Sequence, residues 1–383
     1  MRKIERIGLH NMPWLGHGIE INVDQGCQFL ILTGYNGSGK SRVLSALLET
    51  LSLARNHDFP AKESDWVMSI ALQDDIEVRA IKADRGTMPH DSVQKKVGSI
   101  LTKRESLSKT YKDVEKYLQT GKTRGSYSSQ KSENEDSRNF CAGTIFCDQN
   151  ELEAIENSIN VVAYIDEKIH FNYARKVENA LFENVHNLNN TLLVLITEFV
   201  SSSIVKDSVS SVLESSVKDA MREYFKAAKK KKLEITEEKA VEYVSEKIKL
   251  EEANLSDTVF SSNDFFVISN EFFTLTKRRL VWNDNTIRLR LCDGTLVDWF
   301  LFSKGEKTLL SLFLMVYLYK DSSLFFLDEP ETSLHVEWQQ RLLPALQKLA
   351  PNSQFIIATH SPFLIMNTDV EQVINMAKYT PDA

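Results

Sequence analysis

The clearest pattern of apolar and polar positions lies near the start of the chain. Residues 3–9 and 19–23 alternate between apolar and polar side chains, which predicts two strands of a small antiparallel layer. Residues 28–33 form a mostly apolar run that ends at a glycine and predicts a buried strand. Residues 42–53 then place apolar side chains at helical spacing. The sequence therefore predicts a strand and a helix separated by one glycine-rich loop.

That loop carries a phosphate-binding pattern. Residues 34–41 read GYNGSGKS and fit G-x-x-x-x-G-K-[ST]. Glycines let backbone N–H groups approach phosphate oxygens, and the positive end of the following helix points at the same anion. In this pattern Lys40 reaches the β- and γ-phosphates, and the Ser41 hydroxyl holds Mg²⁺. The alternative is a flexible Gly/Ser turn, and the flanking strand and helix favour nucleotide binding.

Two further buried strands are predicted near the C-terminus, and each ends in polar residues. Residues 324–327 are apolar and precede Asp328 and Glu329, at the strand end where a Mg²⁺-nucleotide would lie. Asp328 is predicted to hold Mg²⁺, directly or through water, and Glu329 to orient or deprotonate the attacking water. Residues 355–358 precede His360, which is predicted to contact the γ-phosphate. The alternatives are a surface acidic turn and a purely structural histidine.

A fourth pattern lies between the loop and these strands. Residues 303–306 read SKGE and precede an apolar helix over 308–320, so by themselves they form a capping box. The P-loop, S-x-G-E, L-D-E-P and T-H-S follow one another in this order along the chain. Together they resemble an ABC-type ATPase of the SMC/RecF class rather than of the transporter class.

The sequence around the last two strands makes the resemblance specific. Residues 327–340 (LDEPETSLHVEWQQ) and 358–364 (ATHSPFL) are similar to stand-alone ATPases related to the OLD family. That family includes ATPase subunits of anti-phage systems such as Septu, PARIS and some retrons. The resemblance covers residues 1–85 and 280–383 well and the middle poorly. It implies an α/β fold: a P-loop ABC-ATPase head, with a mixed sheet flanked by helices and a small antiparallel β layer, interrupted by a mainly helical insertion.

The resemblance also implies roles for the motif residues. Glu329 would be the catalytic base and His360 the switch histidine. Ser41 and Asp328 would bind Mg²⁺, and Ser333 would lie in a loop at a dimer interface. The residues expected to bind ATP are Asn36, Gly37, Ser38, Gly39, Lys40, Ser41 and Arg42, together with Gln149 as the candidate Q-loop glutamine and with Ser303, Gly305 and Glu306 of the signature motif.

The signature motif implies a partner. In the family it caps the ATP held by a second subunit, so we expect an isologous ATP-sandwich dimer or a higher homo-oligomer. The family usually has a small residue where this chain has Lys304. A lysine beside the phosphates is expected to tune or slow hydrolysis. The sequence ends shortly after His360, so we expect any nuclease or toxin to be a separate protein.

Composition narrows the class of protein. The 383 residues are 42% apolar and 26% charged, as in a soluble globular protein. The net charge of −7 argues against nucleic-acid binding by the whole surface. The longest apolar run, over residues 309–319, is too short to span a bilayer and predicts a buried helix. Four cysteines without a C-x-x-C pair fit reduced thiols in a cytoplasmic protein.

The chain is predicted to divide into three segments. Residues 1–94 would form an N-terminal ATPase lobe with the P-loop, and residues 265–383 a C-terminal lobe with the other motifs. Residues 95–264 would form a mainly helical insertion, with a mobile loop near 121–137. The run at 265–268 is predicted to be a strand.

Basic residues concentrate in two parts of this insertion. Residues 95–124 contain nine Lys/Arg against three acids, and residues 226–232 contain a lysine run. Either stretch fits a solvated helix surface or a contact with DNA or another partner.

Three functions remain open on the sequence alone. The leading hypothesis is an ATP-hydrolysing switch subunit of an anti-phage complex that controls a separate effector. A RecF-like DNA-repair ATPase that clamps DNA is the second. A weakly hydrolysing, nucleotide-dependent scaffold is the third.

Overall fold

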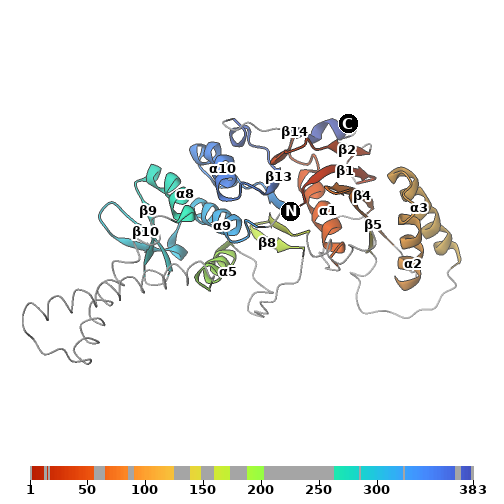
Figure 1. Cartoon of the computed structure of the whole chain (residues 1–383), viewed down its shortest axis with the longest axis horizontal. Coiled ribbons are helices and arrows are strands. Elements are labelled where there is room, and N and C mark those ends of the chain that lie inside the picture. The colour runs from red at the N-terminus through yellow and green to blue at the C-terminus, as the bar shows by residue number, and fades with distance from the viewer. Residues whose placement is uncertain are drawn as a thin grey trace, which may run out of the picture. The chain divides into compact units, whose positions relative to one another are not determined.

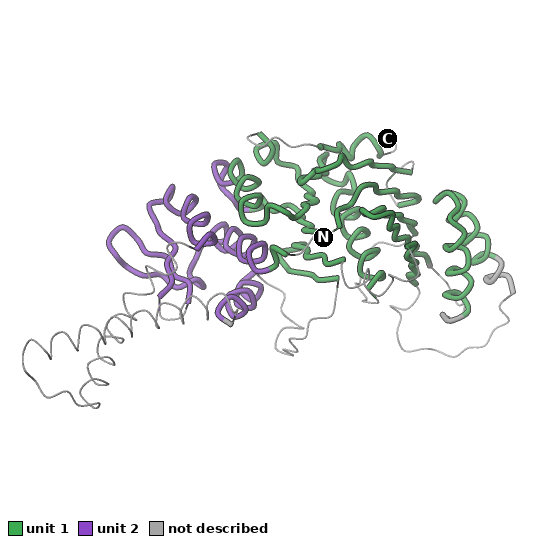
Figure 2. The backbone as a smooth tube through the Cα atoms, in the orientation of Figure 1, with its two compact units in different colours: residues 1–180, 319–332, 339–383 green, residues 181–318, 333–338 purple. Residues whose placement is uncertain are grey.

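The computed structural model describes residues 2–12, 15, 18–55, 65–84, 90–124, 139–147, 159–172, 188–201, 263–283, 286–321, 324–366 and 372–380. Contacts between residues divide the chain into two compact units, coloured separately in Figure 2. Unit 1 comprises residues 1–180, 319–332 and 339–383, and unit 2 comprises residues 181–318 and 333–338.

Unit 1 contains a six-stranded sheet that carries the predicted phosphate-binding strand. Its order is β14-β3-β13-β12-β7-β8, and all neighbours are parallel except β7 and β8. The strands are β3 (Phe29–Thr33), β7 (Val161–Ile165), β8 (Lys168–Phe171), β12 (Leu324–Asp328), β13 (Gln354–Ala358) and β14 (Gln372–Asn375). The central strands are continuous apolar runs because a parallel sheet is covered on both faces.

A second, antiparallel sheet lies in the same unit. Its order is β2-β1-β4-β5-β6. The strands are β1 (Ile4–His10), β2 (Ile19–Asn22), β4 (Trp66–Leu72), β5 (Ile76–Asp84) and β6 (Asn139–Phe146). Helix α1 (Lys40–Leu53) contacts strands of both sheets, and its buried leucines join them into one core. The P-loop helix is therefore fixed along most of its length.

The outer face of the antiparallel sheet is covered by α2 (His90–Leu101) and α3 (Leu107–Arg124), which lie together beyond β5 in Figure 1. Their apolar faces pack on Val67 and Ile81. The chain of unit 1 also includes 3₁₀ turns at Pro362–Leu364 and Met376–Tyr379.

Unit 2 contains a three-stranded antiparallel sheet with helices. The strands are β9 (Arg279–Asn283), β10 (Thr286–Arg290) and β11 (Leu296–Asp298). The helices are α5 (Leu188–Ser201), α8 (Asp264–Phe273) and α9 (Lys304–Leu318), with 3₁₀ turns at Thr274–Thr276 and Trp299–Leu301. Phe199 of α5 meets Phe265 and Tyr317 in an aromatic core. Helix α10 (Val336–Leu349) begins in unit 2 and continues in unit 1.

The predicted α/β class is confirmed, and so are the strand before the P-loop, β3, and the helix after it, α1. The predicted strand at 265–268 is wrong, because these residues lie in helix α8. Asn263 caps that helix by accepting from the N–H of Phe265, and the buried side chains recur at helical spacing. A short run of aromatic and β-branched residues fits a buried helix as well as a strand.

The middle of the chain contributes to unit 1. Strands β6 and β7, both from the predicted insertion, pair within the two sheets of that unit. The division at residues 94 and 265 stays a prediction. Helix α3 reaches Arg124, inside the predicted loop, and the remainder of that loop and the lysine run 226–232 lie outside the described residues. None of the helices among the described residues is long and apolar enough to cross a membrane.

Candidate nucleotide site

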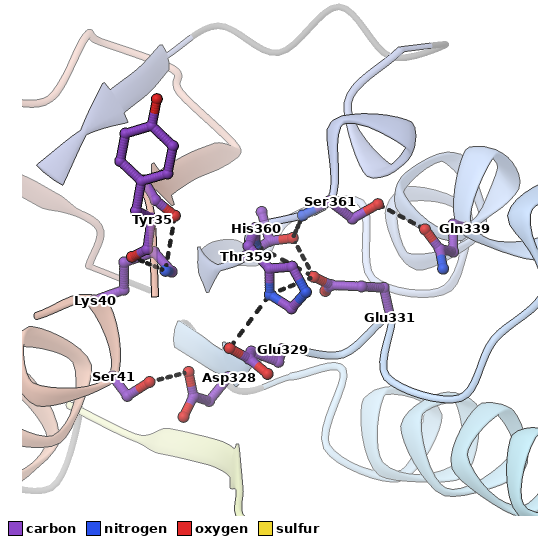
Figure 3. A network of polar contacts seen from close by, with 11 residues as sticks. Tyr35, Lys40, Ser41, Asp328, Glu329, Glu331, Gln339, Thr359, His360 and Ser361 are labelled. Carbon is purple, nitrogen blue, oxygen red and sulfur yellow. Dashed lines mark hydrogen bonds and ion pairs between the residues drawn. The ribbon is translucent and has the colours of Figure 1, made fainter. Parts of the chain in front are cut away.

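The loop between β3 and α1 has the backbone that a phosphate cradle needs. Gly37 and Gly39 have φ of 82° and 85°, in the left-handed region that favours glycine. A Cβ at Gly34 would lie 2.8 Å from Ser38 Oγ, so this position has no room for a side chain. Lys40 Nζ donates to the carbonyls of Gly34 at 3.0 Å and Tyr35 at 3.1 Å. The ammonium group thus lies over the loop, as Figure 3 shows.

The P-loop helix is hydrogen-bonded to the predicted Mg²⁺ carboxylate. Ser41 Oγ donates to Asp328 Oδ1 at 2.9 Å, although the two residues are 287 positions apart. Strands β3 and β12 are separated only by β13, so their carboxyl ends meet at one edge of the parallel sheet. The pKa of Asp328 is raised to about 6, mainly by burial and in smaller part by the charges of Glu329, Asp166 and Glu331, while the hydrogen bond from Ser41 opposes the rise.

Glu329 and His360 face each other across the ends of β12 and β13. Their closest atoms, Glu329 Oε1 and His360 Nδ1, are 3.3 Å apart, and both side chains are about half exposed. Glu329 has φ of 45°, which is strained for a residue with a side chain. Its N–H donates to the carbonyl of Ala358 at 2.8 Å, and this bond holds the turn in place. The strained turn directs the carboxylate toward the imidazole.

These groups line one cavity of about 480 Å³, a size typical of ligand sites. The lining residues are Asn36, Gly37, Gly39, Lys40, Ser41, Arg42, Glu329 and His360. The cavity fits ATP and Mg²⁺, because it combines a cation, a helix N-terminus and glycine backbone with hydroxyl and carboxylate oxygens, the ligands that Mg²⁺ prefers. Ser38 Oγ is buried and has no hydrogen-bond partner among the described residues.

The signature motif lies in unit 2, at the start of α9. The N–H of Ser303 donates to Glu306 Oε2 at 2.7 Å, and the N–H of Glu306 faces Ser303 Oγ at 3.4 Å. This is the capping box that the sequence predicts. Glu306 is buried and also pairs with Arg278, whereas Ser303 and Lys304 are exposed. The carboxylate of Glu306 therefore caps its own helix, whereas Ser303 and Lys304 lie at the surface.

Gly305 packs against the loop that contains Ser333, also in unit 2. A Cβ at Gly305 would lie 2.5 Å from the carbonyl oxygen of Ser333, whose φ of 69° is left-handed. Because the obstacle is backbone, it cannot move aside as a side chain would. The glycine thus keeps the signature motif and this loop in contact.

We expect Gly305→Ala to lower the free energy of unfolding by about 1–3 kcal/mol, the usual cost of overpacking. Gly98→Ala is the matched control: in helix α2 an added Cβ meets nothing within 4 Å, so this variant should gain about 0.5–1 kcal/mol. Chemical denaturation measures both. Equal stability of Gly305→Ala and wild type would contradict the close packing against Ser333.

The raised pKa of Asp328 predicts a dependence of stability on pH. Between the ordinary value of 3.8 and about 6, the native state holds a proton that the unfolded chain has released. Raising the pH from 4.5 to 7 therefore lowers the free energy of unfolding of the nucleotide-free protein by about 2 kcal/mol. Urea titrations at pH 4.5 and 7 measure the difference in the free energy of unfolding between the two pH values. We expect this difference to be smaller by about that amount in Asp328→Asn. Asp321→Asn, at an exposed position, should keep it.

The structure brings together most residues that the sequence marks as one site. The P-loop residues, Asp328, Glu329 and His360 meet in unit 1, and their chemical roles stay predictions. Ser303, Gly305 and Glu306 lie in unit 2. Gln149 lies outside the described residues.

Three residues near the site were not predicted from the sequence. Glu331 and Thr359 contact each other behind His360, and Asp166 follows β7 at the same sheet edge and acts on the pKa of Asp328. For two of them the position in the sequence offered a signal. Glu331 is the second glutamate of the D-E-P-E run, and Asp166 follows an apolar strand as Asp328 does.

Comparisons with known proteins agree on the class. A family model described as "AAA domain, putative AbiEii toxin, Type IV TA system" matches residues 128–367. A retron Vc95 probable ATPase of Vibrio cholerae is 32% identical over 93 residues, which are 21% of this chain and 18% of that protein. A retron Ec83 probable ATPase of Escherichia coli is 34% identical over 83 residues, which are 18% of this chain and 15% of that protein. The matches thus span less than a fifth of each relative.

The solved structures that match this chain include SMC heads. The Smc head domain of Pyrococcus furiosus, bound to the C-terminal domain of ScpA, gives a TM-score of 0.41 at 16% identity, with 96% of this chain and 92% of that chain covered. The SMC head domain from Thermotoga maritima gives 0.39 at 11% identity, with the same coverage.

Proposed function

The chain belongs to the AAA-domain family whose model matches residues 128–367, and from this premise we propose that it binds and hydrolyses ATP as a switch. The hydrogen bond between Ser41 Oγ and Asp328 Oδ1 is the single observation that carries the proposal. It joins the end of the phosphate loop to a carboxylate at the end of a central strand. A hydroxyl and a carboxylate so placed can share one Mg²⁺ beside the nucleotide.

We assign a role in ATP hydrolysis to the main residues of this site. Lys40 and the backbone N–H groups of the loop would bind the β- and γ-phosphates. Ser41 and Asp328 would hold Mg²⁺, which when bound offsets negative charge on the phosphates. Glu329 would accept a proton from the attacking water, and His360 would hold that carboxylate in place. His360 Nδ1 lies within 3.3 Å of Glu329 Oε1, which supports this pairing.

We also propose that the ATPase is a cytoplasmic dimer that controls a separate effector in a defence complex. The two retron relatives, both named as probable ATPases, support the link to defence. The exposed Ser303 and Lys304 at the start of α9 would face the nucleotide of the second copy. ATP binding would close the dimer, and hydrolysis would release or activate the effector.

Affinity purification from the native host tests the effector. We expect Glu329→Gln, which should hold ATP, to retain a nuclease or toxin that is absent from Lys40→Ala preparations. Mass spectrometry identifies the proteins that come with each variant. The same set of proteins with both variants would contradict an ATP-controlled complex.

A DNA-clamping function is the second candidate, because α2 and α3 expose a basic surface. Exposed cations on these helices include Lys95, Lys96 and Lys112, and Lys103 and Arg104 are exposed on the turn between the helices. DNA that co-purifies without a protein partner, with an affinity that falls steeply as salt rises, would favour this candidate.

A further inference from the structure

Behind His360 lies a buried carboxylate that no role assigned so far uses. Glu331 follows the catalytic turn at the end of β12 and is only 3% exposed. Among the described residues, Glu331 Oε2 has no hydrogen-bond partner. The contacts of this carboxylate with the site are made by the other oxygen, Oε1. Burying a carboxylate is costly, so its retention at this point requires a reason.

The contacts of Oε1 are all with the loop that carries His360. Thr359 Oγ1 donates a short hydrogen bond to it, and the N–H of His360 faces it at 3.4 Å. The imidazole Nδ1 of His360 lies 3.9 Å from the same oxygen, and 3.3 Å from Glu329 Oε1. Figure 3 shows the imidazole with Glu329 on one side and Glu331 behind it.

Thr359 extends this contact into the rest of the loop. Its hydroxyl donates to Glu331 and accepts from the N–H of Ser361 at 3.0 Å. Ser361 Oγ in turn donates to Gln339 Oε1 of α10 at 2.6 Å. Each residue of the loop 359–361 therefore makes a polar contact that holds it in place. Thr359 is also almost fully buried.

We propose that Glu331, acting through Thr359, is a positioning residue that sets His360 against Glu329. Glu331 is not placed to bind Mg²⁺ or to act as a base, because its side chain is buried and does not line the cavity at the P-loop. This inference rests on the proposed ATPase function. It adds that the second glutamate of D-E-P-E acts on turnover only through the histidine.

Paired substitutions at Thr359 test the proposal with little change of shape. Thr359→Val removes the hydroxyl and keeps the branched side chain, whereas Thr359→Ser keeps the hydroxyl. We expect kcat for ATP to fall at least about tenfold in Thr359→Val and in Glu331→Ala, which remove the donor and the acceptor of this hydrogen bond, with Thr359→Ser close to wild type. The affinity for ATP should change less than about threefold in all of these variants.

A double-mutant cycle separates positioning from a general effect. In a His360→Ala background, Thr359→Val and Glu331→Ala should lower kcat no further, because the residue that Thr359 and Glu331 position is gone. An additional fall equal to that of the single substitutions would overturn the proposal. So would a loss of ATP affinity that matches the loss of kcat.

A second measurement does not depend on activity. Hydrogen exchange of the segment 359–361 should be at least about tenfold faster in Glu331→Ala than in wild type, because the N–H of His360 loses its acceptor, while α1 is unchanged. If wild type hydrolyses no ATP, the proposed function fails and this exchange still decides whether Glu331 holds the loop. Unchanged exchange would overturn the positioning role.

Discussion

Replacing Glu329 by glutamine is expected to lower ATP turnover by at least about a hundredfold while ATP stays bound, because an amide cannot accept the proton of the attacking water. The substitution keeps the size of the side chain. It also leaves in place the bond from the Glu329 N–H to the carbonyl of Ala358, which holds the strained turn. Phosphate release under Mg²⁺ measures turnover, and equilibrium titration measures binding.

The control for this variant is Glu115→Gln, an exposed glutamate on α3 that is not among the residues lining the cavity. It should hydrolyse ATP at the wild-type rate. Turnover in Glu329→Gln within about twofold of wild type would remove Glu329 from the reaction.

The second large effect concerns nucleotide binding itself. Lys40→Ala should weaken ATP binding by at least about a hundredfold, since hydrogen bonds to charged groups contribute about 1.5–3 kcal/mol each. Lys40 is nearly buried, and its Nζ already lies over the loop at the carbonyls of Gly34 and Tyr35. The ammonium group therefore already lies at the loop that would hold the phosphates.

Lys96→Ala, at an exposed position of α2, is the matched control and should bind ATP as wild type does. Isothermal titration with ATP and Mg²⁺ compares the three proteins. Equal affinity of wild type and Lys40→Ala would mean that the nucleotide binds elsewhere.

How much the sequence predicts depends on how local each feature is. The P-loop could be predicted in detail, because eight consecutive residues determine its backbone and its charge. The meeting of Asp328, Glu329 and His360 could also be predicted. Each follows a buried strand, and parallel strands bring their carboxyl ends to one sheet edge.

Features that depend on tertiary contacts could not be predicted in the same way. A glutamate after a proline reads as a surface residue, and only the fold shows that Glu331 is buried against Thr359. Residues 265–268 of helix α8 are wrongly predicted as a strand for a similar reason. The apolar run is too short to distinguish a helix from a strand by its pattern alone. Packing in the aromatic core of unit 2 favours the helix.

Hydrogen exchange with and without Mg²⁺ and ATP locates the nucleotide on the chain. With Glu329→Gln, to prevent turnover, we expect slower exchange in residues 34–41, 328–331 and 359–361 when ATP and Mg²⁺ are added. Lys40→Ala should abolish this protection. Protection confined to other segments, or none in these three, would contradict the assignment of the site.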